Sequence, residues 1–192
     1  MQARSKERAE RILDAAAHVF AEAGFDAATT EAIAERAETS IGSVYQFFPN
    51  KDALFDAIAS RYFERSRALF ERLMAEASAT SWERLLDDGI DAFAAWGRDD
   101  KDFRAVWINW HRAGSFVETG QAINREFARG IEQVLAAQAR KLPRDKRALV
   151  ATIVIETISG MLFLAAREPD MSTKVVEEAK LLLRRYIEAY TG

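Results

Sequence analysis

Small and polar side chains predominate between Ser40 and Gln46, and their chemistry suits recognition of a hydrogen-bonding surface. Gly42 and Ser43 are small enough to let another molecule approach the backbone closely. Tyr45 carries a hydroxyl that can hydrogen-bond a phosphate, and the Gln46 amide can pair with the edge of an adenine. The segment therefore indicates hydrogen-bonded binding rather than catalysis.

The rest of the sequence offers little material for catalysis or metal binding. It has no cysteine, which excludes disulfides, thiolate metal sites and thiol nucleophiles. His18 and His111 lie far apart in the sequence, so a histidine-built centre is not indicated. The scattered Asp and Glu residues show no spacing typical of an acid–base pair. We therefore expect no enzyme activity, no cofactor and no bound metal.

Hydrophobic periodicity predicts an all-α protein of about nine helices. Apolar residues recur at three- and four-residue intervals, and the three prolines fall between helical patterns. The expected helices cover approximately residues 5–23, 30–37, 41–48, 51–77, 81–98, 103–113, 118–141, 145–167 and 173–190. We expect an N-terminal domain of residues 1–50 and a helical domain of residues 51–192.

The second and third predicted helices are short, and a tight turn joins them. Such a pair, packed on a preceding helix, is typical of a helix-turn-helix unit, whose second helix enters the major groove of DNA. Ile33 and Val44 can share a small core with Phe20. Thr30 and Ser40 stand where helix N-termini can receive phosphates.

About the first 55 residues closely resemble the DNA-binding region of the TetR family. The resemblance implies that Thr30, Tyr45 and Lys51 contact phosphates. It also implies that Ile41, Gly42, Ser43 and Gln46 face bases or nearby backbone, and that a dimeric repressor leaves its palindromic operator when a ligand binds. The matching residues are Ile12-Leu13-Asp14-Ala15-Ala16, Phe20, Gly24-Phe25, Thr29-Thr30, Ile33-Ala34, Ala37, Ser40-Ile41-Gly42-Ser43-Val44-Tyr45, Phe48 and Asn50-Lys51-Asp52-Ala53-Leu54.

Two features depart from what this resemblance implies. Glu38 stands in the turn where the family often has glycine, and Glu31 occupies a position that is basic in some relatives. Residues 1–51 also carry six Lys and Arg against eight Asp and Glu, although phosphate neutralisation drives DNA binding. We expect modest non-specific affinity, reliance on two half-sites, and help from Arg4, Lys6 and Arg8 near the N-terminus.

Aromatic residues are dense in the middle of the chain, which is typical of a pocket for a small, largely apolar or aromatic effector. The alternative is ordinary core packing, since large apolar side chains dominate helical bundles. The candidate ligand-binding residues are Trp96, Phe103, Trp107, Trp110, His111, Phe127 and Glu156.

The last two predicted helices are expected to form a homodimer contact as a four-helix bundle. Burial within one subunit is the alternative. The candidate interface residues are Ile153, Gly160, Phe163, Leu164, Val175, Ala179, Leu182 and Tyr186.

The apolar run 148–166 is nearly long enough to span a bilayer, but Glu156 at its middle argues against a membrane. The charged N-terminus is no secretory signal, so a cytoplasmic protein is expected. A helical dimer that binds a ligand or a protein without DNA is the alternative function.

Overall fold

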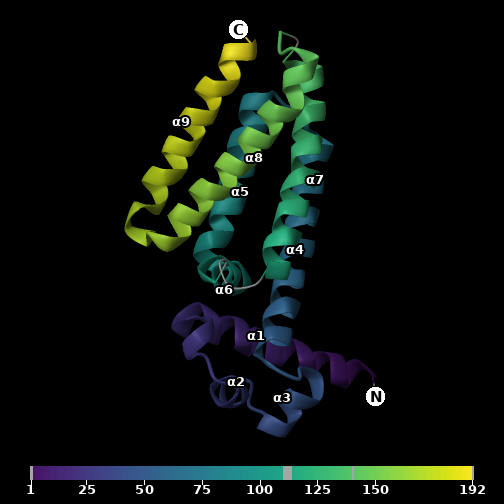
Figure 1. Ribbon diagram of the computed structural model, residues 1–192, viewed down its shortest axis with the longest axis vertical. Coiled ribbons are helices and arrows are strands. Elements are labelled where there is room, and N and C mark those ends of the chain that lie inside the picture. Colours follow the sequence, from purple (N-terminus) through teal and green to yellow (C-terminus); the bar gives the residue numbers. More distant parts are fainter. Residues whose placement is uncertain (1, 110–113, 140, 192) are drawn as a thin grey trace. The chain divides into compact units, whose positions relative to one another are not determined.

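The computed structural model describes residues 2–109, 114–139 and 141–191, and all regular secondary structure within these ranges is helical (Figure 1). The all-α prediction and the predicted helix order are therefore confirmed. The elements are α1 (Gln2–Ala27), α2 (Thr30–Arg36), α3 (Ile41–Phe47), α4 (Lys51–Glu76), α5 (Trp82–Asp99), α6 (Lys101–Ile108), α7 (Gly114–Gln138), α8 (Arg144–Arg167), the 3₁₀ turn η1 (Pro169–Met171) and α9 (Ser172–Thr191).

The chain forms two compact units. The first contains residues 1–64 and 99–116, and the second contains residues 65–98 and 117–192. This division differs from the predicted boundary after residue 50, because α6 packs on α1 although it lies far beyond that boundary in the sequence. The long helix α4 contributes its first half to one unit and its second half to the other.

Side-chain caps fix where several helices of the first unit begin. Thr29 Oγ1 accepts from the Ala32 amide at 3.1 Å, and Ser40 Oγ accepts from the Ser43 amide at 3.1 Å. Asn50 Oδ1 accepts from the Ala53 amide at 2.8 Å, and Asp100 caps α6 in the same way. Each cap satisfies a backbone amide that has no partner within its own helix. The second and third helices therefore start where polar residues break the apolar pattern.

The core of the first unit is built from α1, α2 and α3 on the start of α4. Phe20, Ile33, Val44 and Leu54 are almost fully buried there. The Phe20 ring lies 5.3 Å from the Phe25 ring between centroids. This core holds the two short helices in place although neither is long enough to be stable alone.

In the second unit, the end of α4 packs tightly against α7. The Phe70 and Phe127 rings stack with centroids 4.2 Å apart. Gly130 allows this approach, since a Cβ built on it would lie 2.7 Å from the Phe70 ring. Ion pairs from α9 to α5, Lys180–Asp91 at 2.6 Å and Arg184–Asp87, hold the last helix on the same unit.

Helices α8 and α9 carry both buried and exposed apolar residues. The inward stripe of α9 is Val176, Ala179, Leu183 and Ile187. Ala179, expected at a dimer interface, is only 2% exposed, because packing within the protomer already covers it, and that assignment is corrected here. Among the described residues, α8 is the one helix whose length and composition would allow it to cross a membrane.

Candidate nucleic-acid interface

One side of α3 is turned away from the core of the first unit. Val44 is fully buried, whereas Ile41 is 39% and Tyr45 is 49% exposed. Gly42 and Gln46 are exposed on the same side. A helix that buries one face and exposes large side chains on the opposite face presents those side chains to a partner.

Ser43 of α3 is half-buried. Its side-chain oxygen is buried and has no hydrogen-bond partner among the described residues. The expectation that Ser43 faces bases or nearby backbone stays a prediction.

A groove of about 500 Å³ brings together the three residues that the resemblance assigned to phosphates. Thr30 comes from α2, Tyr45 from α3 and Lys51 from α4, and Asn50 lies beside them. Thr30 is the first helical residue and is 9% exposed, so Thr29 rather than Thr30 is the cap of α2. The groove lies where the starts of α2 and α4 meet, and helix N-termini favour anions.

Lys51 is bound to the protein itself. Its Nζ donates to the carbonyl oxygens of Phe25 at 2.9 Å, Asp26 at 3.3 Å and Ala28 at 2.7 Å, and it lies 4.9 Å from the centre of the Phe25 ring. An ammonium has three donors, and three carbonyls receive them. Lys51 therefore positions residues 25–28 and gives this side of the groove a fixed positive charge.

A second groove, of about 440 Å³, joins the start of α1 to the end of α3. Arg4, Arg8 and Gln46 line it together with Ser5 and Phe47. Two guanidinium groups thus stand beside the amide expected to read a base. This arrangement agrees with the expectation that the basic residues near the N-terminus assist binding.

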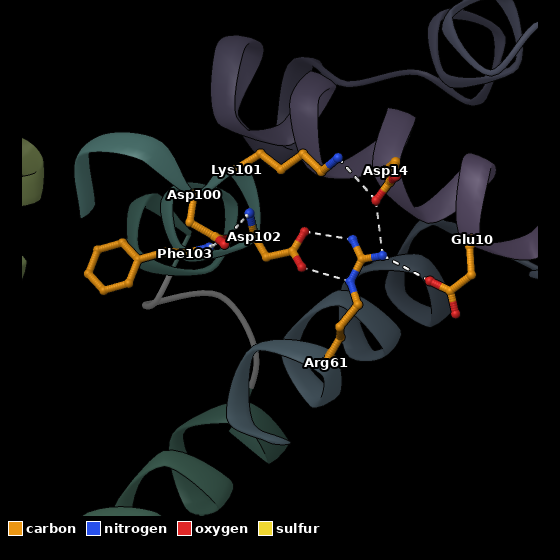
Figure 2. Close-up of polar contacts among 7 residues, drawn as sticks. All are labelled: Glu10, Asp14, Arg61, Asp100, Lys101, Asp102 and Phe103. Atoms are coloured by element: carbon orange, nitrogen blue, oxygen red, sulfur yellow. Dashed lines mark hydrogen bonds and ion pairs between the residues drawn. The ribbon is translucent and has the colours of Figure 1, made fainter. Parts of the chain in front are cut away.

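Ion pairs neutralise several of the acidic residues counted within residues 1–51. Arg61 of α4 lies 3.0 Å from both Glu10 and Asp14 of α1 (Figure 2). Lys101 lies 3.1 Å from Asp14. The cations therefore come from beyond residue 51, which the charge count of the first segment could not include.

Arg61 also forms the central contact between α4 and α6. Its Nε and Nη2 each lie 2.7 Å from a carboxylate oxygen of Asp102, whose side chain is 2% exposed (Figure 2). Partial burial lowers the pKa of Arg61, but the hydrogen bonds and charge of Asp102 outweigh it and raise that pKa above its ordinary value. Sequence reasoning missed this pair, because 41 residues separate its members and neither breaks an apolar pattern.

Comparison with known proteins agrees with this geometry. A family model described as "Bacterial regulatory proteins, tetR family" matches residues 12–58, and a "Tetracyclin repressor-like, C-terminal domain" model matches residues 81–187. The chain belongs to the tetR family of bacterial regulatory proteins. The resemblance noted in the sequence is confirmed, and so are a helix-turn-helix DNA-binding regulator and a function other than catalysis.

Individual relatives support membership of the same family. A TetR-family regulator from Streptomyces coelicolor is 33% identical, with a TM-score of 0.64, over 95% of this chain and 99% of that chain. The repressor Rv1474c of Mycobacterium tuberculosis is 40% identical over 73% of this chain and 67% of its own length. The repressor KstR of Mycolicibacterium smegmatis is 39% identical over 42% of this chain, and the match spans only 39% of that relative's length.

Within this tetR-family chain, the aromatic residues expected around an effector fall in different places. Phe103 and Trp107 lie in the core of the first unit, stacked 5.0 Å apart, and the Trp107 ring nitrogen donates to the Tyr62 hydroxyl at 2.9 Å. Trp96 and Phe127 belong to the second unit, where Phe93 packs against both of their rings.

The remaining effector candidates are less informative. Glu156 is exposed on α8 and accepts from the Asn124 amide at 3.2 Å. Trp110 and His111 lie outside the described residues. The alternative of ordinary core packing therefore accounts for Phe103 and Trp107, and an effector site remains a prediction.

Proposed function

We propose that this chain is a homodimeric transcriptional repressor that binds a palindromic operator and leaves it when a small, largely apolar or aromatic effector binds. The carrying observation is the groove that gathers Thr30, Tyr45 and Lys51 beside the exposed side of α3. A phosphate in that groove would place the outward side of α3 against the major groove, since phosphate contacts position a reader and base contacts specify its sequence.

The apolar surface of α8 supports the dimer. Only 33% of the most apolar stretch of α8 is buried within the protomer. Leu149 is 60% exposed and Ile153 is 37% exposed on α8, and Leu182 is 48% exposed on α9. A second copy of the same two helices would cover these side chains by two-fold symmetry. A membrane is a poor alternative cover, because the exposed Glu156 lies on the same helix.

A two-fold dimer explains why the operator should be palindromic. Two copies of α3 would have to meet successive major grooves, roughly 34–36 Å apart. Residues 1–51 of each copy carry six Lys and Arg against eight Asp and Glu, so two half-sites together would supply the affinity that one lacks. A repressor of this kind would act in the cytoplasm, where it can reach chromosomal DNA.

Repression and effector release are proposed from the relatives and from the aromatic content of the second unit. The curated relatives KstR and Rv1474c are transcriptional repressors by name. A solved structure of the same fold, 24% identical with a TM-score of 0.72, is a SmeT–triclosan complex. Trp96, Phe127 and neighbouring rings supply the kind of lining that an aromatic effector needs.

Selection of bound sequences from a pool of random duplexes tests the proposal, since such a selection does not require a known operator. We expect enriched sequences to be inverted repeats, and sedimentation to give a dimer. The affinity for such a duplex should fall steeply with salt, because binding releases counterions. Enrichment of nothing, with a salt slope near zero, would favour the alternative of a helical dimer that binds a ligand or protein without DNA.

A further inference from the structure

The C-terminal end of α6 is hydrogen-bonded to Phe25 of α1 through one buried side-chain amide, that of Asn109. Asn109 is 4% exposed, and its Oδ1 accepts from the backbone amide of Phe25 at 2.9 Å. Its Nδ2 donates to the Ala105 carbonyl at 2.7 Å, within the last turn of α6. Both ends of this side chain are therefore engaged, and its orientation is fixed.

Phe25 then connects Asn109 to the groove. Its carbonyl oxygen accepts from Lys51 Nζ at 2.9 Å, and its ring lies against the same ammonium. Phe25 is thus hydrogen-bonded to Asn109 through its amide and to Lys51 through its carbonyl oxygen. Phe25 itself lines the groove together with Thr30 and Tyr45.

The backbone leaves the α-helical path just before Phe25. Gly24 has φ 77° and ψ 163°, so the α-helical path of α1 is broken immediately before Phe25. A residue that follows such a break depends on side-chain contacts for its position, because the regular helical ladder is interrupted there. Asn109 and Lys51 supply these contacts.

Buried polar residues occur at both ends of α6 and in the groove. Among the described residues, the buried polar residues are Thr30, Ser66, Asp102 and Asn109. Asp102 binds Arg61 at the start of α6 and Asn109 binds Phe25 at its end, so α6 is attached to the head at both ends. Thr30 belongs to the groove.

We propose that Asn109 is a positioning residue for DNA binding: through Phe25 and Lys51 it sets the shape of the groove from the end of α6. This role is confined to the first unit, which holds Asn109, Phe25, Lys51 and the groove. The inference rests on the proposed function, because its readout is the affinity for operator DNA.

A double-mutant cycle on operator affinity tests the link. Asn109→Ala removes the acceptor for Phe25, and Lys51→Met removes the donor while keeping the length of the side chain. We expect each variant to bind the selected duplex about fivefold more weakly, and the double variant to lose clearly less than the product of the two effects. Gln138→Ala is the matched control, since this amide also binds backbone carbonyls, of Ala77 and Thr80, but within the second unit.

Effects that multiply independently, or an Asn109→Ala variant with wild-type affinity, would overturn the inference. If Asn109→Ala does not fold, Asn109→Leu replaces it, because leucine has a similar size and lacks both the acceptor for Phe25 and the donor to Ala105. Asn109→Leu should bind the selected duplex as weakly as is expected of Asn109→Ala, and wild-type affinity would contradict the role. A wild-type protein that selects no duplex would instead overturn the proposed function.

Discussion

Lys51 shows at the scale of one residue how a site can differ from its sequence signature. The family resemblance implied a phosphate contact, and the structure finds the ammonium bound to three carbonyl oxygens. Its charge still faces the groove, while its hydrogen bonds stabilise residues 25–28. Type and position were predictable from the motif, but the carbonyl partners were not, because no sequence pattern marks which backbone oxygens a folded loop presents.

Glu38 occupies the turn with a strained backbone. Its φ is 52°, a left-handed value that costs a non-glycine residue about 1 kcal/mol. We predict that Glu38→Gly raises the free energy of unfolding by about 0.5–1 kcal/mol, measured by urea denaturation. The control is Glu35→Gly, on the last turn of α2, which should lower it by a similar amount. Equal losses from both variants would contradict the strain at residue 38.

His18 makes the free energy of unfolding depend on pH. Burial first, and then the charges of Arg36 and Lys101, hold the pKa of His18 below its ordinary value of 6.5, although Glu22 and Asp14 oppose the shift. The unfolded chain therefore takes up a proton at a higher pH than the folded protein does. We predict that the free energy of unfolding decreases as pH falls below about 6.5.

Urea denaturation of wild type and His18→Gln at pH 7.5 and 5.5 checks this dependence. Carboxylates contribute equally to both proteins, so the comparison isolates the imidazole. The wild type should lose more stability than the variant on acidification. Identical losses would show that His18 has no depressed pKa.

At the scale of elements, most helices were predictable and the position of α6 was not. Capping residues and prolines marked the ends of α2, α3 and α8 within one or two residues. For α6, the sequence placed the start at residue 103, but Asp100 caps a helix that begins at Lys101. Its ion pairs, Asp102 to Arg61 of α4 and Lys101 to Asp14 of α1, join residues far apart in the sequence, and local periodicity carries no information about such pairs.

Arg61 makes this packing testable. We predict that Arg61→Met lowers the free energy of unfolding by about 3 kcal/mol, because the buried Asp102 carboxylate loses its guanidinium partner. Arg61→Met combined with Asp102→Leu should recover much of the loss, since a buried ion pair can be replaced by apolar groups of similar volume. Urea denaturation measures both. A double variant at least as unstable as Arg61→Met would contradict this account of the pair.

The close contact between α4 and α7 at Gly130 can be tested by alanine substitutions at two glycines. Gly130→Ala should lower the free energy of unfolding by about 1–3 kcal/mol, because its Cβ would lie 2.7 Å from Phe70, whose ring is stacked on Phe127. Gly89→Ala is the control: its Cβ would meet Leu73 at 3.7 Å, an ordinary contact, so helix propensity should raise stability by about 0.5–1 kcal/mol. Thermal denaturation that moves both variants in the same direction would contradict the close approach.

At the scale of the whole molecule, the account depends on the outward surface of α3. Which side of α3 faces outward is decided by how α3 packs on the other helices of the first unit. The sequence predicted that the outward side of α3 reads DNA, and exposure of Ile41, Tyr45 and Gln46 agrees with that prediction. It also predicted a dimer contact on α8 and α9, which stays a proposal supported by the exposed apolar side chains there. It erred at Ala179, because two apolar stripes share α9 and periodicity alone does not say which of them faces the protomer.

The affinity of a Tyr45→Ala/Gln46→Ala double variant for the selected duplex tests the central claim most directly. Both side chains are exposed, so the variant should unfold at the same urea concentration as the wild type. Fluorescence anisotropy should show at least a tenfold weaker complex, since a lost base or phosphate contact costs about 1–3 kcal/mol. Gln133→Ala, exposed on α7, should bind as the wild type does. An unchanged affinity of the double variant would mean that α3 is not the surface that meets DNA.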